Sequence, residues 1–240
     1  MNTFKGPFRI MFEDLRLQFY ILAGVTSFLS ILYIVLGIFV PSDDKFMVGV
    51  SFGPFYGFFL IYPFFFYTKG FKYIISFGGT RKQFLLSSFL NISLFLVMAI
   101  IILNGFYFLT DYLVREGISK GTLFHMGNLA NEAGAYLYPW IDLLWGIILF
   151  SIGFFLSSIW YYFGTLRMMI GLTVFALLAI TFITFSDLYA IINSIIGYYL
   201  LLVHILAVAG IVMIILSYFI MRNGPLERGK TAGFTVGSGS

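Results

Sequence analysis

Five polar side chains interrupt the long apolar runs of this sequence and are its first candidates for chemistry: Asn91, Asn104, Asp142, Asn193 and His204. In apolar surroundings, such groups usually pair with one another or mark a functional path. At ~1.5 Å per helical residue, Asn91 lies near the middle of its run, and the run's far end holds Asn104. We therefore expect Asn104, Asp142 and His204 to form a polar cluster at one end, and Asn91 to lie on a pathway. Hydrogen bonds that only hold helices together are the alternative.

Two motifs have the letters of an active site without its context. The stretch GPLERGKT at 224–231 matches G-x-x-x-x-G-K-[ST], but a working P-loop follows a strand and opens a helix, whereas this stretch follows an apolar run. Ser151 lacks the glycine two residues earlier that a rhomboid-type intramembrane protease normally has. Without cysteine, and with two histidines, thiolate and histidine metal sites are not expected. We expect this chain to be no enzyme and to bind no cofactor or metal itself.

The composition is that of an integral membrane protein. Of 240 residues, 60% are hydrophobic and 10% are charged, whereas soluble proteins contain roughly 45–50% apolar residues. The runs predict an all-α fold with six spans, at about 19–40, 46–67, 84–109, 139–163, 168–185 and 197–221. Residues 2–18 alternate charged and apolar side chains at helical spacing, which predicts an N-terminal amphipathic helix lying in the membrane interface. We expect one transmembrane domain over 1–230 and a flexible tail over 231–240, whose final GSGS is typical of a linker remnant.

The loop at 68–83 has the most informative local pattern. Lys69, Lys72, Arg81 and Lys82 make it basic, with no acidic residue. Apolar residues from Phe71 to Phe77 predict a short helix along the membrane surface, which Gly78 and Gly79 then end as a hinge. Thr80 followed by Gln83 predicts a capping box that starts the next helix. A plain turn with some positive charge is the alternative interpretation.

Basic residues orient the six predicted spans. One face receives 11 of the 14 lysines and arginines, and the other receives Lys45, Arg115 and Lys120. By the positive-inside rule both termini and the 68–83 loop are cytosolic, and the 110–138 loop is external. The net charge of +4 thus reflects membrane orientation, so no nucleic-acid partner is expected.

These features resemble a known family. The amphipathic N-terminal segment, the six spans and the sequence ISFGGTRKQF at 75–84 are similar to the ABC-2 type permease subunits of bacterial, particularly Gram-positive, ABC transporters. The ten-residue pattern is the specific part of the resemblance, and the topology is generic.

The resemblance implies an exporter subunit in the bacterial cell membrane. ATP and magnesium would be bound by a separate ABC ATPase subunit, and a second identical or related permease would complete the pathway through the lipid bilayer. The ATPase contact would comprise Phe71, Lys72, Ile74, Ile75, Phe77, Gly78, Gly79 and Arg81. The polar cluster would be an outer gate, and the cargo a peptide, antibiotic or other amphipathic molecule. An ion-coupled carrier, or a substrate-capture or scaffold protein without ATP coupling, is the competing interpretation.

Overall fold

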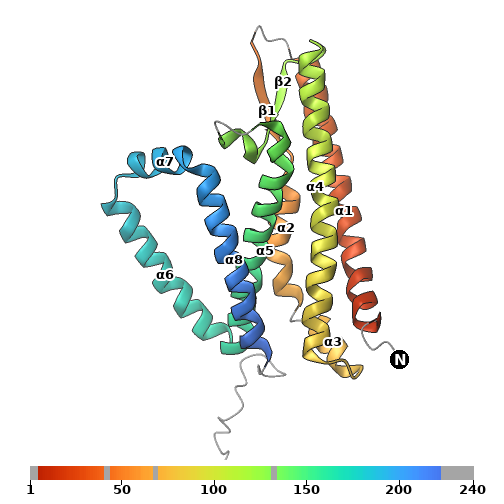
Figure 1. The fold of residues 1–240 in the computed structure, drawn as a ribbon, viewed down its shortest axis with the longest axis vertical. Coiled ribbons are helices and arrows are strands. Elements are labelled where there is room, and N and C mark those ends of the chain that lie inside the picture. Colours follow the sequence, from red (N-terminus) through yellow and green to blue (C-terminus); the bar gives the residue numbers. More distant parts are fainter. Residues whose placement is uncertain (1–4, 41–43, 67–69, 131–133, 223–240) are drawn as a thin grey trace, which may run out of the picture.

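The computed structural model describes residues 5–40, 44–66, 70–130 and 134–222, and helices dominate them (Figure 1). The elements in order are α1 (Lys5–Phe39), β1 (Phe46–Val50), α2 (Gly53–Phe65), α3 (Phe71–Ser76), α4 (Arg81–Arg115), β2 (Gly121–Phe124), the 3₁₀ helices η2 (Met126–Leu129) and η3 (Ala135–Leu137), α5 (Tyr138–Phe163), α6 (Thr165–Phe185), α7 (Leu188–Gly197) and α8 (Tyr199–Arg222). Lys69, the GPLERGKT stretch and the tail lie outside the described residues.

Five helices in the described residues are long and apolar enough to cross a membrane: α1, α4, α6, α8, and the segment Ala135–Phe163 that contains α5. The chain is therefore a multi-pass helical membrane protein. These five helices correspond to the first, third, fourth, fifth and sixth predicted spans. The predicted loop at 110–138 contains the end of α4, strand β2 and two 3₁₀ helices, and its last residue begins α5.

The second predicted span, 46–67, is not one long helix. Its first part is strand β1, which pairs in parallel with β2 so that Phe46 lies opposite Gly121. Its second part is α2, of 13 residues with Pro54 in the first turn, a length of about 20 Å against a hydrocarbon core of ~30 Å. Hydropathy alone does not distinguish a paired strand from a helix. An apolar segment can take either form, because hydrogen bonds to β2 pair the backbone groups of β1 as intrahelical bonds would.

The predicted N-terminal interfacial helix is also corrected. Residues 5–39 form one continuous helix, α1, with no break near Phe19. Met11, Leu15 and Phe19 are buried on one face of this helix and belong to the main apolar core. The amphipathic pattern within residues 5–18 thus reflects packing against the protein rather than a separate helix on the membrane surface.

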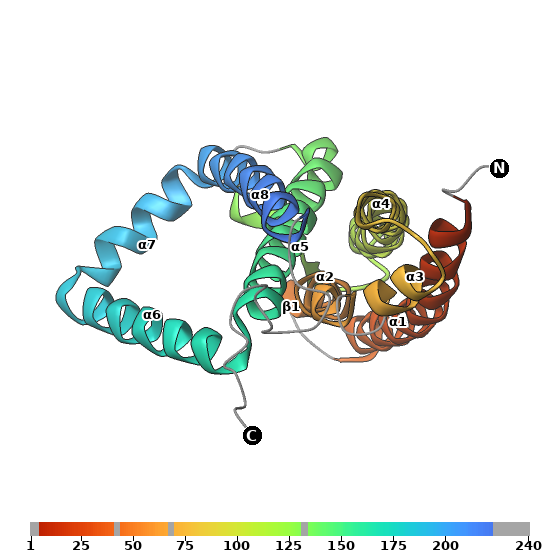
Figure 2. The ribbon, with the colours of Figure 1, turned by 90° about the horizontal axis from the view of Figure 1, so that it is seen from below.

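The packing is organised around α5. Helix α8 packs along α5, α2 packs on α5 as well, and α1 packs along α4 (Figures 1 and 2). Aromatic rings fill the contact between these pairs: Phe19 lies against Phe55 at 5.7 Å and against Phe95 at 5.3 Å between ring centroids. Small residues allow close approach, since a side chain on Gly153 of α5 would collide with the carbonyl oxygen of Leu60 in α2.

Helices α6 and α7 stand away from the other helices in both views (Figures 1 and 2). Within the described part of the chain, Met168 is the only buried residue of α6. The beginning of α1, helix α3 and the end of α8 lie at the same end of the molecule (Figure 1). There, Nη1 of Arg81 donates a hydrogen bond of 3.0 Å to the carbonyl oxygen of Arg222, which joins α4 to α8.

Candidate functional site

A buried polar cluster surrounds the carboxylate of Asp142, in the second turn of α5. Its Oδ1 accepts a hydrogen bond of 2.6 Å from the Tyr56 hydroxyl of α2. Its Oδ2 accepts one of 2.6 Å from Nδ2 of Asn104 in α4 and lies 3.1 Å from Nε2 of His125, between β2 and η2. All four side chains are buried. We call these four residues the Asp142 cluster.

The imidazole of His125 is held in one tautomer. The backbone N–H of Gly127 donates to Nδ1 at 2.8 Å, so Nδ1 is without a proton and Nε2 carries the hydrogen that is donated to Asp142. Asn128 accepts the backbone N–H of His125 at 2.9 Å, and the ring stacks on Tyr138 at 4.7 Å. His125 is therefore a neutral donor that caps η2 and fastens it to α5.

The Asp142 cluster contains one carboxylate and three neutral donors. A buried carboxylate is costly unless hydrogen bonds replace its water, and here Tyr56, Asn104 and His125 supply them. The described residues contain no group of three or more His, Cys, Asp or Glu side chains that could hold a metal ion. The arrangement fixes a negative charge where four segments of the chain meet.

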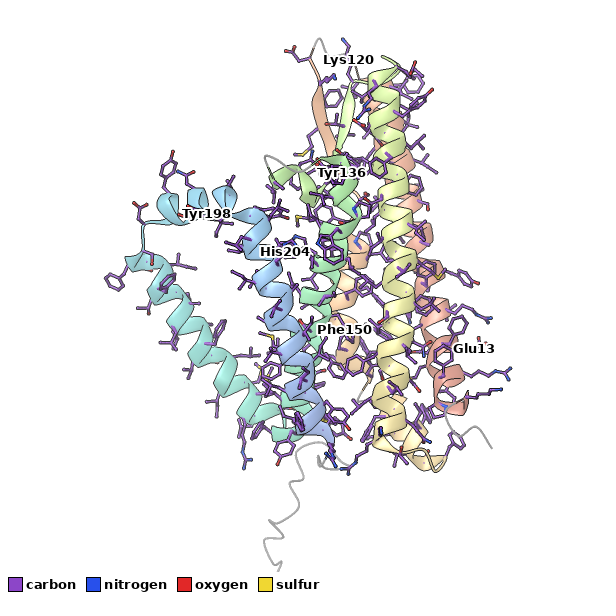
Figure 3. All side chains as sticks on the ribbon, in the orientation of Figure 1. Glu13, Lys120, Tyr136, Phe150, Tyr198 and His204 are labelled. Carbon is purple, nitrogen blue, oxygen red and sulfur yellow. The ribbon has the colours of Figure 1, made fainter. Side chains whose placement is uncertain are left out.

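Of the three residues predicted to form a polar cluster, the structure brings together Asn104 and Asp142 but not His204. Their role as an outer gate stays a prediction. His204 is exposed on α8, where its Nε2 accepts from the Trp140 indole at 3.0 Å and its Nδ1 lies 2.7 Å from the Leu200 carbonyl oxygen (Figure 3). His125 occupies the position beside Asp142 that we predicted for His204. The one local signal for His125 was a capping pattern with Asn128, three residues later.

Asn91 is fully buried and connects two helices. Its Nδ2 donates to the Ser87 carbonyl oxygen of its own helix at 2.9 Å and to that of Phe8 in α1 at 3.2 Å. These contacts favour helix–helix hydrogen bonding, the alternative that the sequence left open, and its role on a pathway stays a prediction.

The basic loop forms the predicted short helix, α3, but its residues divide between two faces. Phe71 and Ile74 are buried, and the Phe71 ring lies 5.1 Å from that of Phe84 in α4 and 5.8 Å from that of Tyr161 in α5. Tyr73, which the sequence did not single out, and Phe77 face outward. We call Tyr73, Phe77, Lys72 and Arg81 the α3 surface.

The turn after α3 is defined by hydrogen bonds. Gly78 has a φ of +80°, and its N–H donates to the Ile75 carbonyl oxygen at 3.0 Å, while that of Gly79 donates to Ile74 at 2.9 Å. The predicted capping box is confirmed: the Gln83 N–H donates to the Thr80 hydroxyl at 3.2 Å, and the Gln83 side chain accepts the Thr80 N–H at 2.8 Å. The turn thus joins α3 to α4 in a fixed geometry.

Of the eight residues predicted to contact an ATPase, Phe71 and Ile74 are buried within this chain. They anchor α3 and offer little surface to a partner. Lys72, Phe77, Gly78 and Arg81 lie at the surface or partly so, together with Ile75 and Gly79. Contact with a partner through these six stays a prediction.

Comparisons with known proteins do not extend this picture. No protein-family model matches the sequence, no curated protein is significantly similar to it, and no solved structure matches its fold.

Proposed function

We propose that the chain is the membrane-spanning subunit of an ATP-driven exporter and that it docks on a separate ATPase subunit through the α3 surface. One observation carries this proposal. Tyr73 and Phe77 expose 58% and 78% of their surface at the basic end of the molecule, although α3 itself is anchored by buried side chains. Exposed aromatic residues on a rigid support are typical of a protein–protein contact.

The charge distribution supports a cytosolic position for α3. The end of the molecule that carries α3 also carries Lys5, Arg9, Arg16, Lys72, Arg81, Lys82, Arg167 and Arg222. The opposite end carries Lys45, Arg115 and Lys120. By the positive-inside rule the α3 end faces the cytosol. In this proposal β1 and α2 together make the second of six passes, both termini are cytosolic, and the membrane is that of a bacterial cell.

The anchoring of α3 suits the transmission of force. Phe71 contacts Phe84 of α4 and Tyr161 of α5, so a displacement of α3 reaches two membrane helices directly. ATP binding would close a pair of ATPase subunits beneath two permease chains, and their differential contacts with α3 would shift α4 and α5 between two states. ATP and magnesium stay on the ATPase, and the cargo is a peptide, an antibiotic or another amphipathic molecule.

Purification from the native host in mild detergent tests the proposal. We expect a tagged wild-type chain to retain a soluble ATPase, identified by mass spectrometry, and Phe77→Asp or Tyr73→Asp to release it. Tyr136→Asp is the matched control, because Tyr136 is 82% exposed but lies toward the opposite end (Figure 3). Recovery of the wild-type chain with no ATPase, or equal losses in all three variants, would count against it.

An ion-coupled carrier is the second candidate, and the Asp142 cluster favours it, because buried carboxylates in membrane helices often bind the coupling ion. In proteoliposomes that contain only this chain, a carrier would move cargo in response to an ion gradient, and Asp142→Asn would abolish that movement. The exporter predicts no such movement without the ATPase.

A further inference from the structure

A groove of about 550 Å³ follows the seam between α1 and α2, away from both the Asp142 cluster and the α3 surface, none of whose residues line it. Asp14 and Gln18 of α1 line one end, close to the basic end of the molecule, and Leu22 with Pro54 line the other. Leu22 comes eight positions after Asp14 in the helix, which is a rise of about 12 Å. Binding sites for small molecules typically have volumes of about 300–1,000 Å³. The groove thus has the size of such a site, with one polar and one apolar end.

The polar end carries an uncompensated negative charge. Oδ2 of Asp14 accepts a hydrogen bond of 2.6 Å from the Tyr62 hydroxyl, which is neutral. Among the described residues no lysine, arginine or histidine lies within ion-pair distance of Asp14. The neighbouring Glu13 differs, because it pairs with Arg16 at 2.7 Å. A carboxylate beside an apolar groove is a binding partner for a cation.

Aromatic rings add to this preference. Phe58 stacks on Tyr62 with 4.6 Å between ring centroids, and both rings line the groove. The faces of aromatic rings attract cations, and their area suits apolar groups. A neutral or anionic ligand would gain only the apolar part of these interactions.

Two glycines keep the α2 wall of the groove open. Gly53 and Gly57 are four residues apart, on one side of α2, and both line the groove. A Cβ atom built on either residue would have no other atom within 4 Å. A large side chain at position 57 would therefore enter the groove without a clash at its Cβ.

We propose that this groove binds a cationic amphiphile. The cationic head lies at Asp14 against the rings of Tyr62 and Phe58, and the apolar body extends toward Leu22 and Pro54. As a cargo site the groove rests on the exporter function proposed above, whereas binding itself requires no ATPase.

Binding of radiolabelled tetraphenylphosphonium to the purified full-length chain, in nanodiscs of phosphatidylcholine, tests the inference. We expect saturable binding that Asp14→Asn weakens at least tenfold. Glu13→Gln is the matched control, because it removes a carboxylate from the adjacent position, which does not line the groove, and should change the affinity less than twofold. Since the assay contains no ATPase, absence of binding to the wild-type chain would refute the groove as a site, whereas absence of an ATPase from the purified wild-type chain would refute the exporter.

Gly57→Leu provides a second test, which does not depend on the folding of the Asp14 variant. It should abolish binding because the leucine side chain occupies the groove. Tetraphenylborate, an anion of the same shape, should not bind saturably. Unchanged affinity in Asp14→Asn or Gly57→Leu, an equal loss in Glu13→Gln, or equal binding of tetraphenylborate would overturn the inference, as would no binding to the wild-type chain.

Discussion

Asn104 of α4 and Asp142 of α5 are joined by a hydrogen bond of 2.6 Å, from Nδ2 to Oδ2, between buried side chains that are 38 positions apart. Tyr56 and His125 donate to the same carboxylate. One side chain therefore connects α2, α4, α5 and the segment that leads into η2. The stability of this end of the molecule should depend on it.

Asp142→Asn should lower stability. The amide oxygen can accept two hydrogen bonds, so one of three buried donors would face the new NH₂ group, at a cost of about 1–3 kcal/mol. The measurement is thermal unfolding in detergent, followed by size-exclusion chromatography. Glu116→Gln, at an exposed position, is the control and should behave as wild type. An Asp142→Asn protein as stable as wild type would show that the carboxylate does not hold these segments together.

The two histidines should differ sharply when each is replaced by phenylalanine. His125→Phe keeps a ring against Tyr138 but loses the bonds to Asp142 and Gly127. Amide hydrogen exchange over residues 121–129 should become at least about tenfold faster, which corresponds to ~1.4 kcal/mol. His204→Phe should leave that segment unchanged. Equal exchange in the two variants would contradict the assignment of His125 to the Asp142 cluster.

Gly153→Ala should destabilise the contact of α5 with α2, because the new Cβ would collide with the Leu60 carbonyl oxygen. Overpacking of this kind costs about 1–3 kcal/mol. Gly171→Ala in α6 should instead raise the free energy of unfolding by roughly 0.5–1 kcal/mol, because alanine favours the helix over glycine and the new Cβ meets no other atom within 4 Å. Thermal unfolding of both variants measures the difference. The packing of α2 described above is wrong if Gly153→Ala is as stable as Gly171→Ala.

Thr80→Ala should weaken the start of α4. Loss of the capping hydroxyl costs about 1 kcal/mol, with a range of about 0.5–2 kcal/mol, and frees the Gln83 N–H from its partner. Thr80→Ser keeps the acceptor and should behave as wild type. Hydrogen exchange at residues 81–84 measures the effect locally, and equal exchange in the alanine and serine variants would show that the cap contributes nothing.

The sequence predicted best those features that depend on neighbouring residues. The capping box of Thr80 and Gln83, the short helix before it and the positions of five membrane helices follow from composition and spacing over one or a few turns. The pair of Asn104 and Asp142 was also predictable, because both are polar residues near the same end of apolar runs.

The errors involve contacts between distant parts of the chain. Hydropathy could not show that Phe46–Val50 pairs as a strand with Gly121–Phe124, because that pairing requires α4 to return the chain to the same end. The prediction that His204 would lie beside Asp142 failed for the same reason. His125 reaches Asp142 only because the segment after β2 folds over the beginning of α5.

The parallel pairing of β1 with β2 has a consequence for the order of folding. Strand β1 emerges from the ribosome about 70 residues before its partner, and α2, α3 and the whole of α4 lie between them. Until α4 is in place, the backbone of β1 has no strand to pair with, and contacts so distant in sequence form slowly. Biogenesis of the first half of the protein therefore ends with the arrival of β2, and a chain truncated before Gly121 should be a target for proteolysis.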